Sequence, residues 1–99
     1  MSLNVYISGK ISGLPHAIAL SKFKATESIL FSENYVPINP MTLNHTTHDK
    51  TWESYMKVCI KELVSCDAIY MMSGYEDSRG AILELEIAKQ LGLKIMYEL

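Results

Sequence analysis

One acidic residue, Glu84, stands among mostly apolar residues in the last third of the chain. At 100° per residue along a helix, it falls at the centre of an apolar arc of roughly 200°, with Ala81 and Ala88 one turn away on either side. A buried carboxylate without a partner is costly, so Glu84 must be paired, hydrated or used. The pattern therefore predicts either a catalytic carboxylate with room for a ligand beside it or a structural one bonded to a backbone group or a tyrosine hydroxyl.

The helix that carries Glu84 is predicted over residues 78–92. Asp77 or Ser78 can cap its start, and Gly92 can end it. Its apolar arc consists of small and aliphatic residues: Gly80, Ala81, Leu83, Leu85, Ile87, Ala88, Leu91 and Gly92. The opposite side is expected to face solvent and carries charged and amide side chains: Arg79, Glu86, Lys89 and Gln90.

Strands and helices alternate along the rest of the chain. The predicted helices cover residues 16–32, 52–65 and 78–92, and the predicted strands cover residues 3–7, 35–40, 68–72 and 93–97. The order βαβαβαβ predicts an α/β fold with a four-stranded parallel sheet, a flavodoxin- or Rossmann-like three-layer sandwich. Pro37 favours an edge position for the second strand.

The carboxyl ends of the predicted strands are the expected place for a ligand, because open parallel sheets bind ligands there. Ser8 and Gly9 end the first strand, Asn39 ends the second, and the helix start with Ser78 and Gly80 follows the third. Glycine permits close backbone approach, and a helix N-terminus attracts an anion such as phosphate. The glycine patterns of a P-loop and of a dinucleotide-binding fold are both absent from the sequence.

Two further groups of residues leave alternatives open. His45, His48 and Asp49 lie close together in sequence but lack a recognised ligand spacing, so we expect no metal and no cofactor. Trp52 and Tyr55, at the head of the predicted second helix, are equally consistent with core or rim packing and with the walls of a base-sized pocket.

Length and composition limit the classes of protein to consider. The 99 residues, 48% of them hydrophobic and 20% charged, predict one globular domain over residues 1–99. A net charge of -2 without basic runs gives no indication of a nucleic-acid polymer as partner. No stretch approaches the ~20 apolar residues of a membrane span. Two cysteines and a start without a signal-peptide pattern predict a cytoplasmic protein, and the small core favours a homo-oligomer, a dimer or tetramer.

Five short motifs follow one another along nearly the whole chain: Tyr6-Ile7-Ser8-Gly9, Ile38-Asn39-Pro40, Trp52-x-x-Tyr55-Met56, Cys66-Asp67 and Ser78-x-Gly80-x-x-x-Glu84-x-x-x-Ala88. In this order they resemble the nucleoside 2-deoxyribosyltransferase-like superfamily. The resemblance is closer to its small bacterial and phage branch, which is catalogued as a domain of unknown function.

The resemblance implies a covalent mechanism. Glu84 would attack C1′ of a 2′-deoxyribonucleoside or its 5′-monophosphate, and a second base or water would release the sugar. Tyr6 resembles the tyrosine that orients this glutamate. The residues that the resemblance places around the sugar or 5′-phosphate are Ser8, Gly9, Asn39, Ser78 and Gly80.

One position departs from the superfamily's pattern. Active relatives commonly carry an aspartate on the second helix, eight residues before the aspartate that opens the third strand, and it assists the leaving base. Here that position is Cys59, and a thiol is a poor substitute for a carboxylic acid. Three hypotheses follow: a transferase or hydrolase that acts on the N-glycosidic bond, a nucleotide-binding module with weak catalysis, and a structural or partner-binding domain.

Overall fold

The computed structural model describes residues 2–43, 45 and 51–99. Helices and strands alternate along it as the sequence predicts. Their order is β1 (Asn4–Ser8), α1 (His16–Ser32), β2 (Val36–Ile38), α2 (Trp52–Leu63), β3 (Ala68–Met71), α3 (Arg79–Gln90) and β4 (Lys94–Tyr97). Two 3-10 helices complete the list: η1 (Pro40–Thr42) follows β2, and η2 (Tyr75–Asp77) precedes α3. The second strand is shorter than predicted because Asn39 already caps η1 through its side chain.

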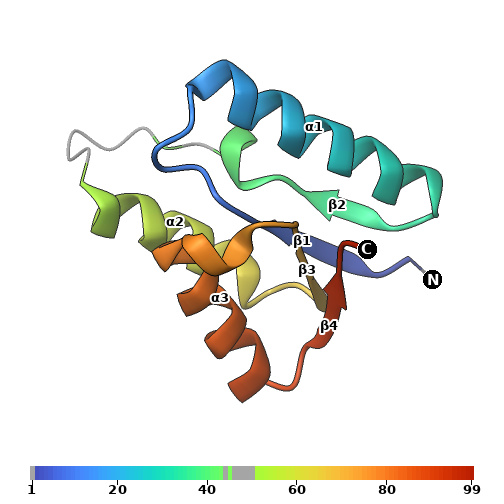
Figure 1. Ribbon diagram of the computed structural model, residues 1–99. Helices are drawn as coiled ribbons and strands as arrows, with labels where there is room; N and C mark the ends of the chain where they lie inside the picture. The colour runs from blue at the N-terminus through green and yellow to red at the C-terminus, as the bar shows by residue number, and fades with distance from the viewer. Residues whose placement is uncertain (1, 44, 46–50) are drawn as a thin grey trace.

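The four strands form one parallel sheet in the order β2-β1-β3-β4. Figure 1 shows α1 on one side of this sheet and α2 and α3 on the other, so the fold is the predicted three-layer α/β sandwich. Pro37 lies in β2, which is an edge strand as predicted. The connection through α1 runs from β1 outward to β2, and the connection through α3 runs from β3 outward to β4, so the direction of winding reverses between β1 and β3. The crevice at such a switch point is where open α/β sheets bind ligands.

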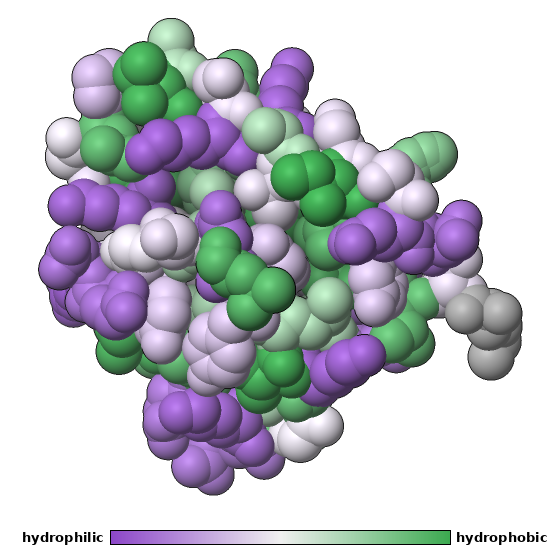
Figure 2. Space-filling model, turned by 45° about the vertical axis from the view of Figure 1, so that its right-hand side comes forward, coloured by the Kyte–Doolittle hydropathy of each residue, from purple (hydrophilic) through white to green (hydrophobic). Residues whose placement is uncertain are grey.

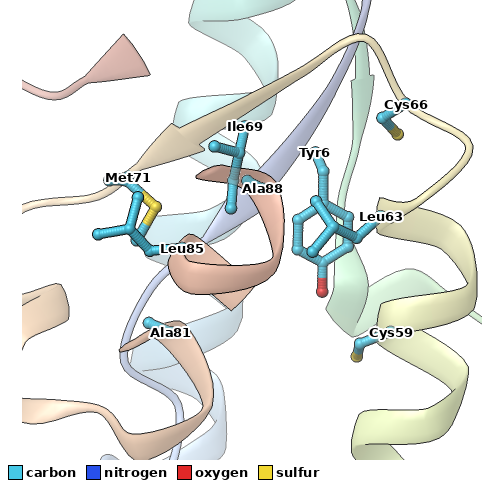
Figure 3. Close-up of a cluster of buried hydrophobic side chains, with 9 residues drawn as sticks. All are labelled: Tyr6, Cys59, Leu63, Cys66, Ile69, Met71, Ala81, Leu85 and Ala88. Carbon is cyan, nitrogen blue, oxygen red and sulfur yellow. The ribbon is translucent and has the colours of Figure 1, made fainter. Parts of the chain in front are cut away.

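Strand β1 divides its side chains between two separate cores, because successive residues of a strand point to opposite faces. Val5 and Ile7 pack with Phe23 and Leu30 of α1. Tyr6 points to the other face and packs between α2 and α3, as Figure 3 shows. Tyr6 and Ser8, two residues apart on β1, therefore both lie on the side of α3.

The buried face of α3 is narrower than the predicted apolar arc. Glu84 and its neighbours Ala81, Leu85 and Ala88 are buried. Leu83 and Leu91, which the arc includes, are 37% and 55% exposed. The sheet and α2 contact only one strip of the helix, and an aliphatic residue outside that strip stays exposed however apolar it is.

Apolar side chains also appear elsewhere on the surface. Figure 2 shows them set among hydrophilic ones on the face in view. Ile29 and Phe31 of α1 are among the exposed large apolar residues. None of the helices in the described ranges combines the length and the apolar character that crossing a membrane requires.

Candidate functional site

A cavity of about 590 Å³ opens at the carboxyl end of β1, beside the N-termini of α2 and α3. This volume is within the range of pockets that hold small organic molecules. Its walls combine aromatic, small and charged residues from four segments of the chain: Tyr6, Gly9, Ile11, Ser12, Pro40, Thr51, Trp52, Tyr55, Met56, Asp77, Ser78, Arg79, Gly80, Ala81 and Glu84. A cavity therefore lies at the strand ends, where the sequence predicts a ligand site.

Glu84 lies in the wall of this cavity with its carboxylate held by two hydroxyl groups. The Tyr6 hydroxyl donates to Oε2 at 2.6 Å, and the Ser8 hydroxyl donates to Oε1 at 2.7 Å. The residue is only 5% exposed, and no cationic side chain of the described residues pairs with it. Each carboxylate oxygen accepts one of these hydrogen bonds and keeps further acceptor capacity for a ligand.

Alternation along β1 explains why both hydroxyl groups reach the same carboxylate. Tyr6 and Ser8 are two residues apart, so their side chains point to the same face of the sheet, next to α3. Burial raises the pKa of the Tyr6 phenol far above its ordinary range, and the nearby Glu84 charge raises it further. Tyr6 therefore keeps its proton and acts as a donor to Glu84 at every physiological pH.

The pKa of Glu84 is raised to about 7, mainly because burial disfavours the charged carboxylate. The hydrogen bonds from Tyr6 and Ser8 act in the opposite direction and lower it. A carboxyl group with a pKa near 7 changes its protonation state in the neutral range. Such values are typical of carboxyl groups that act in acid–base or nucleophilic chemistry.

The start of α3 supplies the cavity with small and polar groups. Ser78 is the N-cap, and its Oγ accepts a hydrogen bond from the Ala81 N–H at 3.1 Å. Its own hydroxyl proton is left to donate to a ligand. Gly80 lies close to α2, since a Cβ at this position would be 3.0 Å from the Met56 sulfur. The glycine therefore serves helix packing as well as the cavity wall.

Gly9 lines the cavity as well. Met72, which directly follows β3, leaves no room for a side chain at this position. A Cβ there would lie 2.9 Å from the Met72 sulfur and 3.0 Å from the Met72 Cβ. Ser8, predicted as a substrate contact, is not in the cavity wall and instead bonds Glu84.

Asn39 is also absent from the residues that line the cavity, although its neighbour Pro40 is among them. Its Nδ2 donates to Glu27 Oε1 at 3.0 Å, and its Oδ1 accepts from the Met41 N–H at 2.9 Å. The buried side chain thus joins α1 to η1. The contact with a sugar that the resemblance implies for Asn39 stays a prediction, and the side chain's present partners are structural.

Trp52 and Arg79 form a pair in the cavity wall that sequence reasoning missed. The Arg79 guanidinium carbon lies 3.8 Å from the centre of the Trp52 ring, a cation–π contact. Arg79 is exposed, as its place on the helical wheel predicts, and only its contact with Trp52 was not foreseen. A signal was nevertheless available: both residues open helices that follow strand ends, and in a parallel sheet such helix starts share one edge.

The Tyr55 hydroxyl is buried and has no hydrogen-bond partner within the described part of the chain. Its ring lines the cavity and stacks on His45, with ring centres 4.3 Å apart and planes at 13°. The His45 Nε2 lies 2.9 Å from the Pro40 carbonyl oxygen, and a carbonyl only accepts, so Nε2 carries the proton. Tyr55 therefore lines the cavity and also packs against the core on the α3 side, so the structure combines the two alternatives.

Cys59 lies beside the Tyr6 hydroxyl and is 1% exposed. Figure 3 shows Tyr6 with its hydroxyl directed toward Cys59 on α2. Burial raises the pKa of the thiol to about 11. The group therefore stays protonated at neutral pH and supplies neither a nucleophile nor an efficient acid.

A metal is not suggested by the arrangement of the side chains that are described. Within residues 2–43, 45 and 51–99, no cluster of three or more His, Cys, Asp or Glu side chains has an arrangement that would hold an ion. His48 and Asp49, which the sequence places near His45, lie outside the described residues.

Comparison with known proteins gives a family but no activity. A search of curated proteins returns no match. A family model described as a domain of unknown function, DUF4406, matches residues 3–97, which include every strand, every helix and the whole cavity wall. The chain belongs to the DUF4406 family.

Proposed function

We propose that this protein cleaves the N-glycosidic bond of a 2′-deoxyribonucleoside or its 5′-monophosphate through a covalent deoxyribosyl-Glu84 intermediate. One observation carries the proposal: a buried carboxylate lies in the wall of a ligand-sized cavity, held by two hydroxyl donors and by no cation of the described residues. The motif order that resembles the nucleoside 2-deoxyribosyltransferase-like superfamily supports the same assignment.

The environment of Glu84 suits a nucleophile. Tyr6 and Ser8 fix the carboxylate plane, so one oxygen lone pair can be aimed at a sugar carbon in the cavity. Burial disfavours the charge of the carboxylate, and formation of an ester removes that charge. The reactive state is the carboxylate, which becomes the major form above a pH of about 7.

The cavity walls suit the parts of a nucleoside. Trp52 and Tyr55 offer aromatic faces on which a base can stack. The Ser78 hydroxyl and the N–H groups at the start of α3 suit the oxygens of a sugar or phosphate. Arg79, held over Trp52, adds a positive charge at the same end of α3.

The two-step course follows from the single nucleophile. In the first step a Glu84 oxygen bonds to C1′ while the bond from C1′ to the base nitrogen breaks. In the second step another base or a water molecule bonds to C1′ and Glu84 leaves as a carboxylate. A base as acceptor makes the protein a transferase, and water makes it a hydrolase.

A nucleotide-binding module with weak catalysis is the second candidate. The observation that favours it is Cys59, a buried thiol of raised pKa where active relatives commonly carry an aspartate. A binding module would keep affinity for a nucleoside or nucleotide in Glu84→Gln, because Gln preserves the size of the side chain. The same substitution would remove covalent chemistry from an enzyme.

The test is intact-protein mass spectrometry together with an assay for free base. Wild type, Glu84→Gln and Cys59→Asp are incubated with 2′-deoxyribonucleosides and their 5′-monophosphates. We expect a deoxyribosyl adduct or released base with wild type and a loss of turnover of at least about 10⁴-fold in Glu84→Gln. Cys59→Asp should increase the rate of base release if the missing acid limits the reaction.

Two results would contradict the enzyme hypothesis. One is the absence of both adduct and free base across the whole panel for wild type and Cys59→Asp. The other is base release that persists undiminished in Glu84→Gln. Retained nucleotide affinity beside the first result would leave the binding module as the function.

A further inference from the structure

The Tyr55 hydroxyl is the one cavity-wall group that the mechanism above leaves unused although it is buried without a partner in the described ranges. A buried polar group normally makes a hydrogen bond, and each exception calls for an explanation. A hydroxyl that lines a ligand cavity is explained most simply by a ligand atom that completes its bonding.

The orientation of Tyr55 is fixed from behind by His45. Their rings stack at 4.3 Å and 13°, and the Nε2 proton of His45 is donated to the Pro40 carbonyl. His45 itself does not line the cavity. Packing against His45 and the core therefore holds the ring of Tyr55. Its hydroxyl has the Cys59 thiol as a neighbour but makes no hydrogen bond within the described ranges, and a thiol is a weak acceptor that a ligand oxygen or nitrogen can replace.

The hydroxyl also stays protonated. Burial raises the pKa of Tyr55 far above neutral, and the nearby Cys59 and the more distant Glu84 charge raise it further. Tyr55 therefore acts as a hydrogen-bond donor in the cavity that Glu84 also lines.

We propose that the Tyr55 hydroxyl donates a hydrogen bond to the base of the substrate, at the acceptor atom next to the glycosidic nitrogen, O2 of a pyrimidine or N3 of a purine. This inference rests on the proposed function and names a group that assists departure of the base. The base is attached to the carbon that Glu84 attacks, so this acceptor must lie in the cavity that Glu84 and Tyr55 both line. The donor comes from α2, the helix on which Cys59 replaces the expected acid.

The step starts from a neutral nucleoside. The Glu84 carboxylate forms a bond to C1′, the glycosidic bond breaks, and its electron pair passes to the base. Tyr55 keeps its proton and stabilises the negative charge on the base through the hydrogen bond. The released base takes a proton from water.

The test compares wild type with Tyr55→Phe on two substrates. The first is a natural 2′-deoxyribonucleoside, and the second is 4-nitrophenyl 2-deoxyriboside, whose leaving group needs little stabilisation. Tyr55→Phe keeps the ring and its stacking on His45. We expect kcat/KM to fall about 100-fold on the nucleoside and less than about threefold on the nitrophenyl compound. Tyr97→Phe, which removes a half-exposed hydroxyl outside the cavity, is the matched control and should change neither value.

An equal loss on both substrates would overturn the inference, because it would mean a role in packing. No loss on the nucleoside would overturn it too. If wild type turns over neither substrate, the proposed function fails, and the affinity of free bases then decides the role of Tyr55. Weaker binding in Tyr55→Phe by about tenfold supports the hydrogen bond, whereas equal affinity, or no base binding by wild type, overturns it.

A comparison of ligands makes the test independent of the folding of the variant. Adenine and 3-deazaadenine differ at the purine N3 acceptor and are titrated into wild-type protein. A preference for adenine of about tenfold supports the donor role, and equal affinity contradicts it.

Discussion

The two faces of the central sheet are built from the same strand and have opposite characters. On the α1 side, Val5 and Ile7 of β1 enter a cluster that consists only of apolar side chains. On the α3 side, Tyr6 and Ser8 of the same strand hold a buried carboxylate at the wall of a cavity. Both faces pack apolar side chains, but the α3 face also keeps a group that is expensive to bury. The α1 side therefore adds packing without such a burial cost, and we expect it to offset the cost on the α3 side.

Phe23→Ala tests the supporting role of the α1 side and should have the largest effect on stability. The side chain is fully buried in the apolar cluster, so its loss leaves a cavity and should cost about 3–5 kcal/mol. Urea denaturation measures the loss. The pKa of Glu84 in the remaining folded protein should not change. A loss below about 1 kcal/mol would mean that this face contributes little.

The pH dependence of unfolding measures the free-energy cost of burying the charged Glu84 carboxylate on the α3 side. The pKa of Glu84 is about 7 in the folded protein against an ordinary value of 4.5, so the folded state binds the proton more tightly. Its contribution to stability is complete below about pH 4.5 and is lost as the pH rises through 7, by about 3 kcal/mol. Glu84→Gln removes this titration.

Denaturation curves from pH 4.5 to 8 for wild type and Glu84→Gln measure the difference directly, because the other titrating groups are shared. The variant should gain stability relative to wild type as the pH rises. Parallel curves for the two proteins would contradict the raised pKa of Glu84.

Ser8→Ala sharpens the comparison further, with a smaller effect. The hydrogen bond from Ser8 lowers the pKa of Glu84, so its removal should raise that pKa and move the acid limb of the pH–rate profile upward by about one unit. Thr26→Val is the matched control on the other face, where the Thr26 hydroxyl donates only to the Lys22 carbonyl of its own helix. An unchanged profile in Ser8→Ala, or an equal shift in Thr26→Val, would remove the distinction between the faces.

The fold was predictable from the sequence because it depends on local patterns. Helical and strand periodicities alternate, and a parallel sheet follows from that order. Glu84 was identifiable for the same reason, since a helical wheel needs only one segment. Its partner Tyr6 was predicted through the motif resemblance. The helical wheel alone indicated only that a tyrosine hydroxyl could bond Glu84, without identifying which tyrosine.

The features that the sequence did not reveal are contacts between segments that lie far apart along the chain. The contact of Arg79 with Trp52 joins two helix starts that are far apart in sequence. The exposure of Leu83 depends on how far α2 and the sheet extend over α3. The bonds from the Asn39 side chain to Glu27 and Met41 depend on where α1 and η1 lie beside the end of β2. Each case requires relative positions that one-dimensional periodicity does not contain.

The division of β1 between two cores restricts how this sequence can change through evolution. A deletion or insertion of one residue within the strand would exchange its two faces, placing Tyr6 and Ser8 against α1 and aliphatic groups beside Glu84. Such a change would damage folding and chemistry in a single step. We therefore expect changes in length to be tolerated in the loops and not in the first strand for as long as the carboxylate is retained.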